Sequence, residues 1–168
     1  MNEKVYNSAL ALLRDFEGLR LSPYYCSANK RTIGYGHKIL KNETNLLGTI
    51  TKDEAEKLLR SDFDKVLLPI VDYFSRSAGR LADCEYCALA LFAFNCGLSV
   101  VLDKLSSNIK TFMLLRASCS KNVLTERAKL FYRMRQYIHY HDKAGKVCES
   151  KGLKDRRDKE IRFFCGYL

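Results

Sequence analysis

The sequence predicts an α+β fold that is mainly helical and arranged in two lobes, with a small antiparallel β-sheet in the N-terminal lobe. Apolar residues recur at helical spacing through most of the chain. One segment, "SPYYCSANKRTIGYGHKI", loses that spacing, contains glycines and alternates like short strands. The 168 residues, 47% of them hydrophobic, suffice for one domain with a substantial core.

The N-terminal lobe is expected to cover about residues 1–65. It begins with an amphipathic helix whose apolar face holds Val5, Ala9, Leu12, Leu13 and Phe16. That apolar segment is too short and too interrupted for a secretory signal peptide. After the sheet, a second helix starts where Thr51 is the N-cap and Glu54 completes a capping box.

The C-terminal lobe is expected to cover about residues 66–168 and to be helical. Its core is predicted to be the segment "LADCEYCALALFAFNCG", which is apolar on nearly all sides and ends at Gly97. Three further helices are predicted, at Ser106–Arg116, Asn122–Gln136 and Leu153–Phe164.

Charge and cysteine content limit the classes of function. The net charge is +10, and residues 116–162 hold 14 Lys and Arg against 6 Asp and Glu, so one end of the chain favours polyanions. No apolar run approaches the ~20 residues of a membrane span, so we expect no membrane insertion. Seven cysteines, an odd number, fit reduced thiols and cytosolic synthesis.

No metal or cofactor is expected. Cys84 and Cys87 have the spacing of a redox or metal-binding pair, but no second pair accompanies them and their neighbours form an apolar helix. His139 and His141 alternate with aromatic residues, and could bind zinc only together with distant residues. We therefore interpret the two cysteines as core residues and the two histidines as surface or groove residues.

The chemistry-bearing residues cluster between Glu17 and His37. Glu17 ends an apolar helix just before Gly18, where partial desolvation would keep a carboxyl group protonated. Cleavage of a glycosidic bond requires such an acid to protonate the leaving oxygen. It also requires a group on the opposite face of the sugar that activates water or attacks the anomeric carbon. Eight residues separate Glu17 from Cys26, and five separate Cys26 from Thr32.

This order, followed by "IGYGH", resembles the active-site segment of the phage-type lysozymes, glycoside hydrolase family 24. The segments "ITKDEAEKLLRSDF", "AFNCG" and "GLKDRRDKEIRFF" resemble further parts of that family in the same order. The resemblance covers most of the chain. It implies a lysozyme-like fold and a muramidase that hydrolyses the β-1,4 bond between N-acetylmuramic acid and N-acetylglucosamine in peptidoglycan. It also implies that Glu17 is the catalytic acid and Thr32 the catalytic threonine.

Cys26 occupies the position where many members of the family have aspartate and others have cysteine. A thiol, with an ordinary pKa of ~8.5, is mostly neutral at pH 7 and lacks the charge of an aspartate. It can still accept a hydrogen bond from water. Beside Lys30 and Arg31, a thiolate would be a base or nucleophile, whereas a loop thiol without chemistry is the simplest alternative. We favour Cys26 and Thr32 positioning an attacking water, with inversion at the anomeric carbon.

Four further residues are predicted to bind substrate or support the site: Tyr35, His37, Asn95 and Arg156. His37 could shuttle protons, but we favour a role in fixing its turn by hydrogen bonds. The resemblance implies that Arg156 forms an ion pair with the catalytic acid across the two lobes. A solvated basic helix is the alternative.

The expected partner is a peptidoglycan glycan strand, bound by a monomer without specific affinity for nucleic acid. We expect synthesis in a host bacterial cytoplasm without a signal peptide, and action on the cell wall after release. Two other classes stay open: a non-catalytic protein that binds peptidoglycan or another polyanion on the same fold, and a nucleic-acid-binding module.

Overall fold

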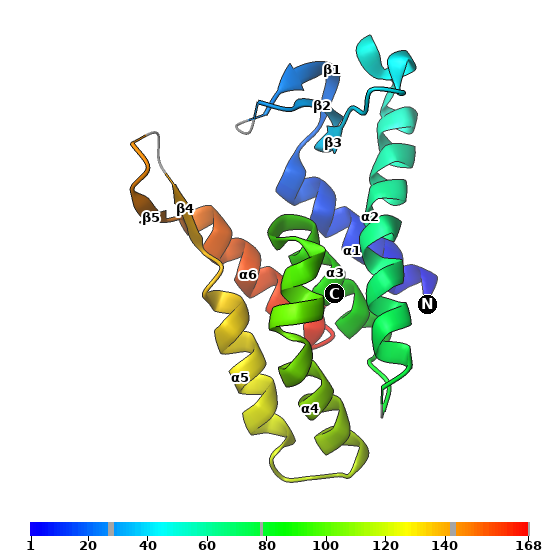
Figure 1. Ribbon diagram of the computed structural model, residues 1–168. Helices are drawn as coiled ribbons and strands as arrows, with labels where there is room; N and C mark the ends of the chain where they lie inside the picture. The colour runs from blue at the N-terminus through cyan, green and yellow to red at the C-terminus, as the bar shows by residue number, and fades with distance from the viewer. Residues whose placement is uncertain (27–28, 78, 142–143, 168) are drawn as a thin grey trace. The chain divides into compact units, whose positions relative to one another are not determined.

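The computed structural model describes residues 1–26, 29–77, 79–141 and 144–167 and is drawn in Figure 1. It divides into two compact units, one formed by residues 7–65 and the other by residues 1–6 with 66–168. Helices dominate, and the one three-stranded sheet among the described residues is antiparallel and lies in the first unit. The predicted α+β, mainly helical fold class is confirmed.

The smaller unit, residues 7–65, contains most of α1 (Glu3–Glu17) and the three-stranded sheet. The sheet follows α1 directly in the chain and has the order β1 (Arg20–Tyr25), β2 (Arg31–Gly34), β3 (His37–Lys38). The register between β1 and β2 shifts along β1, as in a β-bulge. The sheet therefore lies immediately after the helix that ends in Glu17.

The helix α2 (Lys52–Ser75) starts in the smaller unit and continues into the larger one. The predicted capping box is confirmed, because the backbone N–H of Thr51 donates to Glu54 Oε2 (2.7 Å) and the N–H of Glu54 donates to Thr51 Oγ1 (3.2 Å). A short 3₁₀ helix, η1 (Thr44–Leu47), precedes it. This cap fixes the start of the helix that lies next to the sheet residues of the site.

The larger unit is built around α3 (Asp83–Cys96), in which every residue from Glu85 to Ala93 is buried. It packs against α6 (Lys151–Phe164) and the short π-helical turn η2 (Val100–Lys104). Gly97, with φ of +95°, ends α3 as predicted, and its N–H donates to the carbonyl of Ala93 (2.7 Å).

The remaining helices of this unit, α4 (Ser106–Ala117) and α5 (Val123–Arg135), pack against each other (Figure 1). Between α5 and α6 lies an antiparallel hairpin of β4 (His139–His141) and β5 (Val147–Glu149). This hairpin was not predicted from the sequence. Two strands of three residues are too short to give a recognisable alternation.

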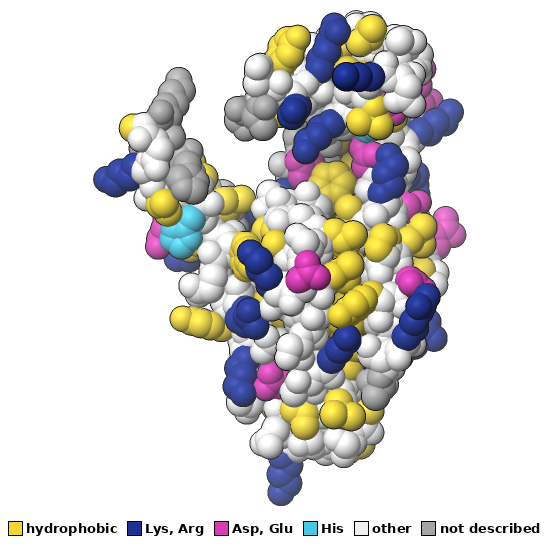
Figure 2. All heavy atoms as spheres, in the orientation of Figure 1, with side chains coloured by type: hydrophobic (Ala, Val, Ile, Leu, Met, Phe, Trp, Pro, Cys, Tyr) yellow, Lys and Arg dark blue, Asp and Glu magenta, His cyan; other side chains and the backbone are white. Residues whose placement is uncertain are grey.

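The surface is rich in charge. Figure 2 shows Lys and Arg side chains over both units, interspersed with acidic and apolar ones. None of the helices among the described residues has the length and hydropathy of a membrane span.

Candidate active site

Glu17 is the last residue of α1 and is half-buried. The N–H of Gly18 donates to the carbonyl of Arg14 (2.9 Å), and the φ of +66° at Gly18 turns the chain away from the helix axis. Gly36, in the turn between β2 and β3, faces the Glu17 carboxyl group. A Cβ at Gly36 would lie only 3.6 Å from Glu17 Oε2, and the φ of +87° also favours glycine.

Cys26 and Thr32 meet at one backbone carbonyl, that of Lys30. The N–H of Cys26 donates to Lys30 O (3.0 Å), and the hydroxyl of Thr32 donates to the same oxygen (2.9 Å). The carbonyl of Cys26 accepts from the N–H of Asn29 (2.8 Å), which closes the loop between β1 and β2. The two predicted site residues are thus held by a common anchor.

This anchor determines what the Thr32 hydroxyl can do next. A hydroxyl has one proton, and the proton of Thr32 is donated to Lys30 O, so its remaining capacity is that of an acceptor. Thr32 is buried, with 2% of its surface exposed. A water that reaches this oxygen would be confined and would donate a hydrogen bond to it.

Tyr35, at the end of β2, is buried, and its hydroxyl donates to Glu56 Oε1 on α2 (2.9 Å). Arg14 on α1 binds the same carboxylate, with Nε 2.8 Å from Oε1 and Nη2 2.6 Å from Oε2. The bonds from Arg14, with a smaller contribution from Tyr35, lower the pKa of Glu56 below its ordinary value against the effect of desolvation. Tyr35 therefore supports the structure through Glu56.

His37 is held on both ring nitrogens. Its Nδ1 lies 2.6 Å from Asp62 Oδ2 on α2, and its Nε2 lies 3.0 Å from Glu43 Oε2. The hydrogen bond to Asp62 raises the pKa of His37 despite its burial, and Glu43 adds to the rise. Desolvation opposes ionisation of Asp62, but the bonds from His37 and Lys65 outweigh it and lower the pKa of Asp62. That His37 fixes its turn through these contacts stays a prediction.

Asn95 and Arg156 lie in the larger unit. Asn95 Oδ1 accepts a hydrogen bond from Arg157 Nη2 (2.8 Å). Arg156 is buried, and its Nε donates to Glu160 Oε1 (3.0 Å) and its Nη2 to the carbonyl of Leu91 (3.4 Å). The helix carrying Arg156 is therefore not a wholly solvated one, and the expected pairing of Arg156 with Glu17 stays a prediction.

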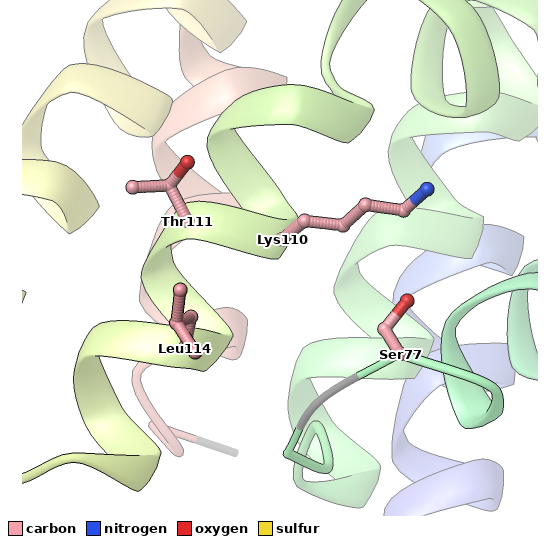
Figure 3. Close-up of a pocket in the computed structure, with 4 residues that line it drawn as sticks. All are labelled: Ser77, Lys110, Thr111 and Leu114. Atoms are coloured by element: carbon pink, nitrogen blue, oxygen red, sulfur yellow. The ribbon is translucent and has the colours of Figure 1, made fainter.

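Pockets lined by described residues of the larger unit include two with volumes of a few hundred Å³. One, of about 260 Å³, is lined by Asn95, Cys96, Tyr137, His139 and Leu153. The other, of about 310 Å³, is lined by Ser77, Lys110, Thr111 and Leu114, with the Lys110 side chain extending toward the Ser77 segment (Figure 3). Lys110 Nζ donates to the Tyr73 hydroxyl (3.1 Å) and lies 4.4 Å from the centre of that ring, so this lysine has a structural partner.

Several residues that bind the predicted site residues, or that bind Arg14 or Arg156 beside them, were not predicted from the sequence. They are Arg14, Glu43, Glu56, Asp62, Arg157 and Glu160. Only the Arg157–Glu160 pair has a local signal, an i, i+3 spacing on a helix. The others bind partners on separate elements, which spacing alone does not reveal. Among the described residues, no group of three or more His, Cys, Asp or Glu side chains could hold a metal ion.

Comparison with known proteins identifies the family. The profile of the Phage lysozyme family matches residues 14–160, which is most of the chain, so the chain belongs to the phage lysozyme family. The match includes Glu17, Cys26 and Thr32, as well as the α6 segment with Arg156. The lysozyme-like resemblance seen in the sequence is therefore confirmed.

Individual relatives are endolysins. The chain is 32% identical over 95 residues to an endolysin of Acyrthosiphon pisum secondary endosymbiont phage 1. This match covers 56% of this chain and 61% of the relative. It is 27% identical over 162 residues to an endolysin of Bacillus phage B103, which covers 95% of this chain but 53% of that relative. The chain thus spans between half and two thirds of these relatives.

Solved structures agree in fold. An endolysin from Escherichia coli O157:H7 phage FAHEc1 superposes with a TM-score of 0.72 at 25% identity, covering 95% of this chain and 92% of that one. The muramidase domain of SpmX from Asticaccaulis excentricus gives a TM-score of 0.69 at 23% identity, covering 97% and 98%. The second likeness is one of fold alone.

Proposed function

We propose that this protein is a muramidase that hydrolyses the β-1,4 bond between N-acetylmuramic acid and N-acetylglucosamine in peptidoglycan. One observation carries the proposal: in a chain of the phage lysozyme family, a half-buried carboxyl group ends α1 and faces the glycine turn after β2. Cleavage of a glycosidic bond requires a carboxyl group that donates a proton to the leaving oxygen, and Glu17 would be that group.

In the proposed mechanism Glu17 is the general acid. As the bond to the leaving sugar stretches, the remaining sugar acquires oxocarbenium character, and proton donation by Glu17 prevents a negative charge from forming on the departing oxygen. The glycine at position 36 supports this role, since its φ of +87° favours glycine and even a Cβ there would be in van der Waals contact with the Glu17 carboxyl group.

Cys26 and Thr32 would position the water that attacks the anomeric carbon. Because Thr32 donates its proton to Lys30 O, its oxygen would accept a hydrogen bond from that water. The Cys26 backbone is fixed at the same carbonyl, which limits where its sulfur can lie. Direct attack by water on the face opposite the leaving group inverts the anomeric configuration.

The proposed substrate is a peptidoglycan glycan strand, and the protein would act on it as a monomer. The net charge of +10 would draw it to anionic cell-wall polymers. Its endolysin relatives support a setting in which the enzyme is made in a host bacterial cytoplasm and reaches the cell wall after release.

A second candidate is a non-catalytic protein that binds peptidoglycan on the same fold. The observation in its favour is Cys26 itself, a thiol at a position where a carboxylate would supply the negative charge or general base. The bonds of Cys26 and Thr32 to one carbonyl favour the muramidase over this binding protein. Binding alone does not require a thiol and a hydroxyl held at the same point.

Clearing of a cell-wall suspension and release of reducing ends separate the two candidates. We expect wild type to give both and Glu17→Gln, which removes the acid but keeps the size, to lose at least ~100-fold in rate. Asp15→Asn is the matched control, since Asp15 is an exposed acid in the same helical turn, and it should retain wild-type activity. Equal activity of wild type and Glu17→Gln would refute the proposed role of Glu17, and an inactive, wall-binding wild type would favour the second candidate.

The anomer released first from a soluble glycan tests the water mechanism. Nuclear magnetic resonance at early times should show the α-anomer. A β-anomer would exclude simple attack by water and point to a covalent intermediate on Cys26.

A further inference from the structure

A polar network beside the proposed acid has no role in the mechanism above. It consists of Arg14 on α1, Tyr35 at the end of β2 and Glu56 on α2, all in the smaller unit. The carboxylate of Glu56 is its centre, with three hydrogen bonds from Arg14 of 2.6–2.9 Å and one from Tyr35 of 2.9 Å. Charge-assisted bonds of this length and number hold three separate elements together.

The Arg14 end of the network controls the backbone that carries Glu17. Arg14 lies three residues before Glu17 on α1, and its carbonyl accepts the bond from Gly18 that closes the last turn of the helix. Fixing the Arg14 side chain to α2 therefore limits fraying of the turn that includes Glu17. A frayed last turn would move the carboxyl group relative to the sugar.

The Tyr35 end controls the surface against which Glu17 lies. Tyr35 precedes Gly36, and its ring is buried with only 6% of the residue exposed. With the hydroxyl bound to Glu56, the Tyr35–Gly36 segment is fixed at the distance that leaves room for Glu17 Oε2. Glu56 thus holds both of the backbone segments that meet at the acid.

The start of α2, which carries Glu56, is held firmly in place. Glu56 follows Ala55, whose Cβ would lie 3.4 Å from a Cβ placed on Gly34 of β2, so α2 and β2 are in close contact at this point. The capping box of Thr51 and Glu54 lies one turn earlier. Glu56 is therefore presented from a well-supported helix start.

Glu56 also engages a charge that could otherwise disturb the acid. An i, i+3 spacing on a helix allows Arg14 to reach Glu17. An arginine on a carboxylate favours its ionised form, which cannot donate a proton. The multiple bonds to Glu56 instead direct the guanidinium toward α2.

We propose that Glu56 is a positioning residue for Glu17, acting through Arg14 and Tyr35 by fixing the acid and by keeping the Arg14 guanidinium away from it. This inference rests on the proposed role of Glu17 as general acid. Glu56 itself would touch neither the substrate nor the attacking water.

The test compares steady-state kinetics of Glu56→Gln on a soluble glycan substrate with those of Glu54→Gln. Both substitutions remove one negative charge from the first turns of α2, but Glu54 is exposed and its carboxylate binds Thr51 in the capping box instead of Arg14 and Tyr35. We expect Glu56→Gln to lower kcat about 10-fold with KM within about twofold of wild type, and Glu54→Gln to match wild type. Circular dichroism confirms that both variants are folded at the assay temperature.

The pH profile distinguishes positioning from a loss of folded protein. Release of Arg14 toward Glu17 would ionise the acid at lower pH, so the alkaline limb of the kcat profile should move to lower pH in Glu56→Gln. The double variant Glu56→Gln with Arg14→Met lacks the released guanidinium charge. Its alkaline limb should therefore return toward the wild-type pH. A smaller amount of folded enzyme would lower the whole profile without moving it.

Three results would overturn the inference. They are wild-type kinetics in Glu56→Gln, an equal loss in Glu54→Gln, and a lowered profile whose limbs do not move. If Glu56→Gln does not fold, Tyr35→Phe takes its place, and wild-type kcat in that variant overturns the inference. Loss of activity in Glu17→Gln with wild-type kinetics in Glu56→Gln would refute this inference alone, whereas full activity in Glu17→Gln would refute the proposed function as well.

Discussion

Cys26 is the residue at which this chain departs most from a two-carboxylate glycosidase. Its N–H and the Thr32 hydroxyl share Lys30 O, which suggests a common task. If that task is to position water, Cys26→Ala should lower kcat by about 100-fold, in the range of general-base contributions. Cys26→Asp should recover much of the loss, since a carboxylate can both accept from and deprotonate the water.

Cys165→Ala is the matched control, because Cys165 is an exposed thiol at the end of α6. It should have wild-type turnover. Unchanged turnover in Cys26→Ala would show that the thiol has no chemical role and that Thr32 alone serves the water.

The contact between His37 and Asp62 predicts a pH-dependent stability. The raised pKa of His37 gives stability that is complete below the ordinary histidine pKa of ~6.5 and is lost as the pH rises through the folded pKa. The lowered pKa of Asp62 gives stability that is present above ~3.9 and is lost at lower pH. The contact should therefore stabilise most between about pH 4 and 6.5.

Asp62→Asn should cost about 1.5 kcal/mol in free energy of unfolding near the middle of this window, the value of a hydrogen bond to a charged group. Urea denaturation at about pH 5.5 and about pH 9 measures the cost at both ends of the His37 titration. We expect a smaller cost at the higher pH, and a cost that is equal at both would contradict the assignment.

At the residue scale, the order of residues along the chain predicts Glu17, Cys26 and Thr32 as the chemical residues of the candidate site, and this assignment stays a prediction. The partners that hold these residues could not be predicted from the sequence. Arg14 and Glu56 are 42 residues apart, and only folding brings them together. Hydrogen-bond partners on different elements depend on packing, which no local pattern specifies.

At the scale of elements, α6 contains a buried ionic cluster that should be essential for stability. Glu160 and Arg157 are fully buried, and Arg157 Nε lies 3.1 Å from Glu160 Oε2, while Arg156 Nε lies 3.0 Å from Glu160 Oε1. Removing one partner leaves a buried charge uncompensated. Glu160→Gln should therefore lower the free energy of unfolding by about 3 kcal/mol or more.

Asp158→Asn is the control on the same helix, since Asp158 pairs with Arg135 at a half-exposed site. An exposed pair of this kind contributes about 0–1 kcal/mol. Thermal or urea unfolding of both variants gives the comparison, and similar costs for the two would argue against a buried cluster.

Elements with strong local signals were predicted well. The capping box of α2 and the glycine that ends α3 lie where the sequence indicated. The β4–β5 hairpin was not predicted, because each of its strands has only three residues. Its pairs join residues that are six to ten positions apart in the sequence, such as His139 and Glu149, and no local pattern reveals them. Strong periodicity identifies long helices, whereas short hairpins depend on pairing.

At the scale of the whole molecule, the charge of +10 predicts salt-dependent action on cell walls. Salt screens the attraction to anionic wall polymers, with a Debye length that falls from about 10 Å at 0.1 M to about 3 Å at 1 M. Raising the salt concentration over that range should lower the rate on wall suspensions several-fold. The rate on a neutral soluble glycan should change much less, and an equal fall on both substrates would contradict electrostatic attraction.

The central claim, that Glu17 drives hydrolysis of the muramyl bond, is tested most directly by mass spectrometry of digested peptidoglycan. Wild type should give fragments that end in reducing N-acetylmuramic acid with water added across the bond, and Glu17→Gln should give none. Anhydro-muramic ends, reducing N-acetylglucosamine ends, stem peptides released from intact glycan, or identical fragments from both proteins would contradict the account.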